Sequence, residues 1–427
     1  MLTVYSNPKR EDWKKLCERP AVNQDGLNDF ISELFKAVSR DGDSAVYAYS
    51  KKYDAASSKN FRLSAEKIQA LADSVAPELK TAMQRAKDNI STFHEAQKLA
   101  QLNVEVEKGV NCWTKQVAID KVAIYIPGGS APLFSTVLML ALPAKIAGVQ
   151  EINLFTPLNK EGSIHPAIAY AALLCGVENV FTIGGAQAIA AASIGTQQIP
   201  KCDKIFGPGN QYVTAAKRFA QNLGSAIDMP AGPSEVLVWA DEDANPAFIA
   251  ADLLSQAEHG ADSQCVLLCN SQKTVDLVQQ ELLRQVQLLP RKEIALAALK
   301  NCFAVVFSDD DAALLQTDFS NYYAPEHLII QANNADDLAI KVRNAGSVFI
   351  GEYSPESVGD YASGTNHTLP TAGFAKAYSG VNLASFSKQI TFQKLSKKGL
   401  ENLASTVVCM AENEGLQAHA NAVKIRL

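Results

Sequence analysis

The sequence lacks the features that would place it among membrane, exported or nucleic-acid-binding proteins. Its longest apolar stretches, near 137–149 and 180–195, are interrupted by Pro143, Lys145 or paired glycines and fall short of a membrane span. The first twelve residues carry no apolar signal-peptide core and no Arg/Ser-rich transit pattern. The net charge of −6 provides no basic excess for binding phosphates. We therefore expect a globular protein with small-molecule partners, no membrane and no nucleic acid.

Cysteine pairs of the metal-binding kind are also missing. The chain has 8 cysteines, and none stands at Cys-x-x-Cys spacing from another. Cys265 and Cys269 flank an apolar Val-Leu-Leu run, which is typical of thiols buried beside a strand. Scattered, unpaired cysteines are typical of a reducing cytoplasm, so we predict a cytoplasmic protein. Any metal is expected to have nitrogen and oxygen ligands.

A complete Gly-x-Gly-x-x-Gly fingerprint is absent, although short apolar strands run into glycines and then helices three times. Val122–Ile126, Asn179–Ile183 and Lys204–Phe206 each end in such a turn. This alternation predicts a parallel, doubly wound sheet whose ligands bind beyond the carboxyl ends of the strands. The turn after Phe206 has two of the three glycines, so a dinucleotide is only weakly indicated by the loops alone.

The flanking regions have other textures. Residues 1 to about 100 show helical apolar spacing. A second α/β core is predicted between about 240 and 350, with strands at 236–239, 264–269, 304–307, 328–330 and 347–350. Residues 370–387 resemble an extended connector to a helical tail. A short amphipathic tail cannot bury its face alone, so it must dock on the body or on another subunit.

Histidine is scarce, and three of the 6 histidines have oxygen-bearing neighbours: His259, His327 and His419. Gln256 and His259 are three apart in a predicted helix, which puts both on one face. Glu326 precedes His327 at the start of a strand, and adjacent bases suit two proton abstractions. A predicted loop presents Asp360. A polar helix end, a surface pair and an Asx-turn remain the structural alternatives at these three places.

Long runs of the sequence closely resemble the histidinol dehydrogenases, which oxidise L-histidinol through histidinal to L-histidine with two NAD. The resemblance covers almost the whole chain. It rests on Tyr125–Thr136, Gly184–Ile189, Lys204–Asn210, Ile227–Val236, Leu253–Gly260, Pro325–Ile329 and Gly359–His367.

Carried over residue by residue, the resemblance implies one zinc ion per subunit. Its ligands would be Gln256, His259, Asp360 and His419. Ser234, His327, Glu414 and His419 would line the histidinol site together with the other zinc ligands, and Tyr125, Gln187 and Asn210 would contact NAD. The base His327 would take the alcohol proton, and Glu326 would activate water for the aldehyde step. His94 and His165 are expected to be structural, and His367 has no assigned role.

The fold implied with this resemblance is α/β. It has two incomplete Rossmann-like doubly wound domains, small helical N-terminal and C-terminal extensions, and an intertwined homodimer with shared active sites. The predicted divisions are a helical arm at 1–25, a zinc and catalytic domain from 26–120 with 240–372, an NAD-contacting domain at 121–239, and a connector and tail at 373–427 that docks on the partner. A silent zinc- and imidazole-binding paralogue and a zinc hydrolase are the alternatives.

Overall fold

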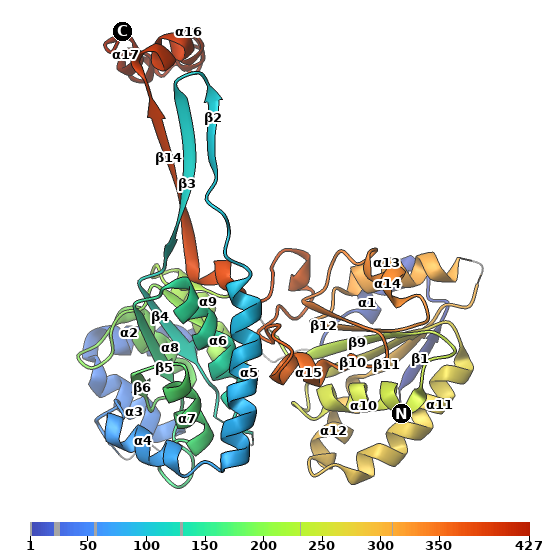
Figure 1. The fold of residues 1–427 in the computed structure, drawn as a ribbon. Helices are drawn as coiled ribbons and strands as arrows, with labels where there is room; N and C mark the ends of the chain where they lie inside the picture. The colour runs from blue at the N-terminus through green and yellow to red at the C-terminus, as the bar shows by residue number, and fades with distance from the viewer. Residues whose placement is uncertain (1, 21–25, 55–57, 129–130, 231, 310) are drawn as a thin grey trace.

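The computed structural model describes residues 2–20, 26–54, 58–128, 131–230, 232–309 and 311–427. Two α/β lobes lie side by side, and a long arm of strands that ends in helices projects from one of them (Figure 1). Each lobe contains a parallel sheet, one of five strands and one of six. The predicted α/β class with parallel sheets is confirmed. None of the described helices combines the length and apolarity needed to cross a bilayer.

The five-stranded lobe has the strand order β6-β5-β4-β7-β8, with every neighbouring pair parallel. The chain adds strands on one side of β4 and then on the other. Helices cover both faces, which is why its strands are nearly continuous apolar runs. The three predicted strands are confirmed as β4, β6 and β7. The elements are β4 (Lys121–Tyr125), α6 (Phe134–Ala147), β5 (Glu151–Phe155), α7 (Pro166–Leu174), β6 (Asn179–Phe181), α8 (Gly185–Ile194), β7 (Lys204–Phe206), α9 (Gln211–Gln221) and β8 (Ala226–Ile227).

Four N-terminal helices pack on this same lobe, so the assignment of 26–120 to the zinc domain is wrong. They are α2 (Leu27–Asp41), α3 (Asp43–Tyr53), α4 (Ala65–Asp73) and α5 (Pro77–Glu95). The apolar face of α2 joins the core that contains β4 and α8, and α5 joins the core on the opposite face of the sheet. An amphipathic pattern shows which face of a helix is buried, but not against which sheet.

The six-stranded lobe has the order β1-β11-β10-β9-β12-β13, again all parallel. The five strands predicted for the second core are confirmed as β9 to β13. Its elements are β1 (Thr3–Ser6), η1 (Arg10–Asp12), α1 (Trp13–Leu16), β9 (Glu235–Ala240), α10 (Pro246–Ala257), β10 (Gln264–Cys269), α11 (Gln272–Gln285), η2 (Val286–Leu288), α12 (Lys292–Ala298), η3 (Leu299–Asn301), β11 (Phe303–Val306), α13 (Ala312–Tyr323), β12 (His327–Gln331), α14 (Ala335–Ala339), β13 (Ser347–Ile350) and α15 (Glu356–Tyr361).

Two predicted boundaries fail in this lobe. The segment 1–25 is not simply a helical arm, because β1 forms the edge of the sheet and pairs with β11. A four-residue edge strand has too little pattern to stand out in a sequence. The boundary at 239 is also wrong, since β9 pairs with β10 and β12 in the middle of this sheet.

The arm contains a three-stranded antiparallel sheet that the sequence patterns did not indicate. Its order is β14-β3-β2, formed by β2 (Asn103–Glu107), β3 (Val110–Ala118) and β14 (Ser387–Leu395). The 3-10 turns η4 (Phe374–Lys376) and η5 (Leu383–Phe386) precede β14, and α16 (Lys397–Asn413) and α17 (Gln417–Lys424) follow it. Few arm residues are buried, and Met410 of α16 is 61% exposed. The arm therefore has faces that the described chain leaves uncovered.

Candidate active site

The candidate catalytic residues lie where strands of the six-stranded sheet begin. β12 opens at His327, which pairs in register with Val236 near the start of β9. Glu326 and Ser234 each stand just before one of these strands. Helix α10 follows β9 and returns to the same edge, so its last turn brings Gln256 there. The helix ends at Ala257, and His259 follows it in a further turn with its N–H donated to the Gln256 carbonyl at 3.2 Å.

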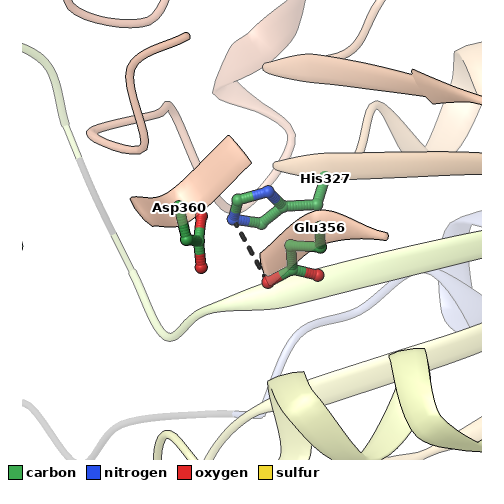
Figure 2. A group of neighbouring side chains, drawn as sticks. All are labelled: His327, Glu356 and Asp360. Carbon is green, nitrogen blue, oxygen red and sulfur yellow. Dashed lines mark ion pairs between the residues drawn. The ribbon is translucent and has the colours of Figure 1, made fainter. Parts of the chain in front are cut away.

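A compact group of ionisable side chains surrounds His327 (Figure 2). Its Nε2 lies 3.7 Å from Oε1 of Glu326 and 3.7 Å from Oε1 of Glu356. Ligand atoms of His327, Glu356 and Asp360 all lie within 4.8 Å of one another. Glu326, His327 and Glu356 are all buried. The pair Glu326–His327 is therefore part of an interior site and is not a surface pair.

Glu356 is a site residue that the sequence interpretation missed. The prediction placed Asp360 in a loop, whereas the structure places it in the short helix α15 together with Glu356. Residues four apart lie on one helical face, so both carboxyl groups point at His327 (Figure 2). Helical spacing of the two acids was the available signal, and the small residues and glycines around them masked it.

Burial controls the charge of this group. Desolvation raises the pKa of Glu326 and of Glu356 well above the usual range of a carboxyl group, and neighbouring carboxylates raise both further. Burial also raises the pKa of Asp360 to about 6, against the opposing effect of His259. The pKa of His327 falls to about 3, first through desolvation and then through His259 and His367. The imidazole of His327 is consequently neutral near pH 7.

Several polar atoms at the site lack a partner among the described residues. Both amide atoms of Gln256, Nδ1 of His327 and Oδ1 of Asp360 are buried without a hydrogen bond. Burying such atoms is costly unless something binds them. His259 is exposed as a residue, yet atoms packed around its imidazole lower its pKa by desolvation, and the charge of Asp360 opposes this shift. These nitrogen and oxygen donors fit a divalent cation such as zinc.

His367 connects the two lobes at this site. Its Nε2 lies 3.0 Å from Oγ1 of Thr136 at the start of α6, and its Nδ1 lies 2.8 Å from the Asp360 carbonyl oxygen. A carbonyl oxygen can only accept, so Nδ1 carries the proton and Nε2 accepts from the threonine hydroxyl. Burial lowers the pKa of His367 to about 4, which keeps this neutral form. The imidazole holds the Asp360 turn against the five-stranded lobe.

The three residues predicted to contact NAD lie together at the carboxyl edge of the five-stranded sheet. Tyr125, Gln187 and Asn210 line one cavity of about 770 Å³. Such an edge is where parallel sheets bind ligands. Gly207 allows β4 and β7 to meet closely there, because a Cβ on it would lie 2.1 Å from the Tyr125 carbonyl oxygen.

Hydrogen bonds hold the side chains of Tyr125 and Gln187 in place, and the side chain of Asn210 caps a helix. The Tyr125 hydroxyl accepts from Gly185 N at 3.0 Å, and Gln187 Nε2 donates to Asp54 Oδ2 at 2.6 Å. The Asn210 side chain accepts from the backbone of Tyr212 and Val213, so it caps helix α9. A pre-ordered cavity of this size with a few fixed polar groups suits a cofactor or another small molecule.

His419 and Glu414 do not join the site within one chain. Both are exposed at the end of the arm, on α17 and just after α16. Figure 1 shows these helices at the far end of the arm, well away from α15. Ser234, in contrast, lies beside Glu235, whose backbone N–H donates to Glu326 Oε2 at 3.0 Å. The structure thus gathers Gln256, His259, Glu326, His327, Asp360 and Ser234 at one sheet edge and leaves the two tail residues apart.

Comparisons with known proteins agree on one family. The family model for histidinol dehydrogenase matches residues 17–427. Histidinol dehydrogenase of Bacteroides thetaiotaomicron is 52% identical over 100% of this chain and 99% of its own. The histidinol dehydrogenase of Shewanella oneidensis is 49% identical over 100% of this chain and 98% of its own. A crystal structure of histidinol dehydrogenase from Elizabethkingia anophelis has a TM-score of 0.96 at 50% identity, covering 100% of this chain and 98% of that one. This chain belongs to the histidinol dehydrogenase family.

Proposed function

We propose that this protein catalyses the NAD-dependent, four-electron oxidation of L-histidinol to L-histidine through bound L-histidinal, the final steps of histidine biosynthesis. The observation that carries the proposal is the buried Glu326–His327 pair, with unpartnered polar atoms of Gln256 and Asp360 at the same sheet edge. The full-length similarity to histidinol dehydrogenases supports the choice of substrate.

The chain's own groups suit two successive proton abstractions. A neutral His327 imidazole has one unprotonated nitrogen that can accept the hydroxyl proton of an alcohol. The carboxyl groups of Glu326 and Glu356 lie 3.7 Å from its Nε2, where in their ionised form they would stabilise the imidazolium cation. Glu326 would then activate a water molecule for addition to the aldehyde, and His327 would act again in the second oxidation. Bound NAD would supply the oxidant for both oxidations.

Zinc is the metal that we assign to this site, one ion per subunit. Gln256, His259 and Asp360 would hold it, with His419 of the partner subunit as the fourth protein ligand. A bound zinc ion would supply Lewis-acid coordination that orients the substrate nitrogens. The group His327, Glu356 and Asp360 is the competing ligand set. We favour the first set because it leaves His327 free as a base and gives the Gln256 amide a partner.

The cavity lined by Tyr125, Gln187 and Asn210 is the proposed NAD site. The five-stranded lobe has a strand order that reverses at β4, and Tyr125 ends that strand. Dinucleotides bind at such reversal points in Rossmann-like domains, and we assign both lobes to incomplete versions of that fold.

We further propose an intertwined homodimer with shared sites. The arm carries His419 and Glu414 away from the remaining site residues, and it exposes Met410 of α16 and Leu416 just before α17. A second copy of the chain, related by a twofold axis, would receive this tail at its own site and cover those side chains. We also propose that the protein is cytoplasmic, because free cysteines are typical of a reducing compartment.

The test of the proposed function is the NADH yield from L-histidinol with zinc-loaded enzyme. Two NADH per substrate molecule supports the four-electron oxidation. One NADH, or none from fully metallated protein, contradicts it. A silent binding paralogue would yield none, but the presence of both Glu326 and His327 in one interior site speaks against that alternative. Ester hydrolysis without NAD would instead indicate the zinc hydrolase.

A further inference from the structure

A buried ion pair outside the proposed chemistry lies directly behind Glu326. Arg19, from the N-terminal segment, donates from Nε to Oε2 of Glu235 at 2.8 Å and from Nη2 to Oε1 at 2.9 Å. The two side chains are 14% and 1% exposed. A two-pronged contact of this kind fixes the carboxylate in orientation as well as in place.

Glu235, the acidic member of this pair, is hydrogen-bonded to Glu326, the proposed water-activating residue. The backbone N–H of Glu235 donates to Oε2 of Glu326 at 3.0 Å. The residue whose side chain Arg19 clamps is therefore the same residue whose main chain holds the Glu326 carboxyl group. Any rotation of the Glu235 peptide moves that N–H and with it the direction in which the carboxyl group faces.

A second contact reaches Glu326 from the other side. Nη2 of Arg19 donates to the Tyr323 carbonyl oxygen at 2.8 Å, and the guanidinium stands over the Tyr323 ring at 3.8 Å from its centroid. Tyr323 ends helix α13, and Ala324 then turns the chain with φ 53°, a region that residues with a Cβ disfavour. Glu326 follows two residues later. Arg19 thus braces a strained turn that leads into the active site.

The described contacts require an arginine. The guanidinium engages both oxygens of Glu235, the Tyr323 carbonyl and, through Nη1, the Cys17 carbonyl at 2.8 Å. A lysine offers one compact ammonium group and cannot span these acceptors at once. Arg10 provides a contrast in the same N-terminal segment. It forms a more exposed ion pair with Asp318, which is not one of the groups that Arg19 binds.

We propose that Arg19 is a positioning residue that sets the orientation of Glu326 by bracing the Glu235 peptide and the Tyr323–Ala324 turn together. The proposal rests on the proposed function, in which Glu326 activates water for the aldehyde step. It predicts that loss of Arg19 impairs oxidation of histidinal, which needs that water, far more than reduction of histidinal by NADH, which reverses the alcohol step without it.

The experiment compares these two reactions of L-histidinal in zinc-loaded enzyme. Arg19→Met should lower kcat for oxidation by about 10-fold or more and change kcat for reduction by less than about threefold, with little change in KM, since a small misplacement of a catalytic group costs this much. Arg19→Lys should show the same split, because charge alone does not restore the brace. Arg10→Met is the matched control and should leave both reactions unchanged.

Glu326→Gln separates failure of this inference from failure of the proposed function. If Glu326→Gln loses oxidation selectively and the Arg19 variants do not, the role of Arg19 is refuted. If Glu326→Gln affects both reactions equally, the proposed role of Glu326 itself fails. Should Arg19→Met not fold, Arg19→Lys decides alone: equal loss in both directions, or full activity, overturns the proposal.

Discussion

At the scale of single residues, the site concentrates carboxyl groups whose pKa values burial raises. Asp252 belongs to this set although it lies outside the proposed chemistry. It accepts from Gln331 Nε2 at 2.6 Å in the interior, and its charge contributes to the raised pKa of Glu356. Clusters of acids with shifted pKa values are a feature of functional sites, where burial and neighbouring charges match a group's pKa to its task.

Replacing Asp252 with asparagine should change how stability depends on pH. Burial raises the pKa of Asp252 from 3.8 to about 7, against the hydrogen bond from Gln331. The unfolded carboxyl group ionises near 3.8 while the folded one keeps its proton, so raising the pH from 4 to 7 favours unfolding. Asp252→Asn removes this penalty. The difference in the free energy of unfolding between the variant and the unaltered protein should grow in favour of the variant by roughly 1 kcal/mol per pH unit across this range.

Denaturant unfolding of the zinc-free proteins at several pH values measures this difference. Asp276→Asn is the matched control, since Asp276 also accepts from a glutamine, Gln272, but on the exposed face of α11. That control should show no pH-dependent gain. Parallel pH curves for Asp252→Asn and the unaltered protein would contradict the assignment of a protonated, buried Asp252.

Metal content should distinguish the two possible ligand sets. His259→Asn should lower zinc affinity by about 10-fold or more, because it removes a proposed ligand, whereas Glu356→Gln should retain the metal. Glu356→Gln nearly preserves side-chain volume. Dialysis against zinc buffers followed by metal analysis gives the answer. Zinc loss in Glu356→Gln with retention in His259→Asn would favour the His327, Glu356 and Asp360 group.

At the scale of secondary-structure elements, apolar buried strands were the most predictable part of the fold. Strands such as β10 are continuous apolar runs because helices cover both faces of their sheet. The arm strands gave no such signal, since β14 has no buried residue. The sequence predicts a loop in place of helix α15, because the six residues of this helix include Gly359 and follow Pro355. The pairing of helices with sheets depends on contacts far apart in sequence, so the sequence predicts the wrong lobe for α2 to α5.

Helix α9 offers a prediction at this scale, because Asn210 both caps it and lines the proposed NAD cavity. Asn210→Asp keeps a capping oxygen, so thermal stability should hold, but its added negative charge should weaken NAD binding. Asn210→Ala should weaken binding and also cost about 1 kcal/mol of stability through the lost cap. Thermal unfolding and NAD titration measure the two effects separately. Unchanged NAD affinity in both variants would remove Asn210 from the site.

At the scale of the whole molecule, the site that we propose is incomplete in one chain. The residues near His327 and the NAD cavity come from both lobes, which His367 joins through Thr136 and Asp360. His419 and Glu414 lie at the end of the arm (Figure 1). Local spacing in the sequence allowed His259, His327 and His419 to converge but could not show that two chains are needed. Only the family resemblance indicated this, and the position of the arm supports it.

Complementation between inactive subunits tests the shared, four-electron site most directly. His259→Ala and His419→Ala damage the same proposed zinc site from different chains, so a mixed dimer has one site with both changes and one intact site. Mixing equal amounts should restore roughly a quarter of the full activity after subunit exchange, with two NADH per L-histidinol. No recovery, despite exchange shown with differently tagged subunits, would contradict a site built from two chains.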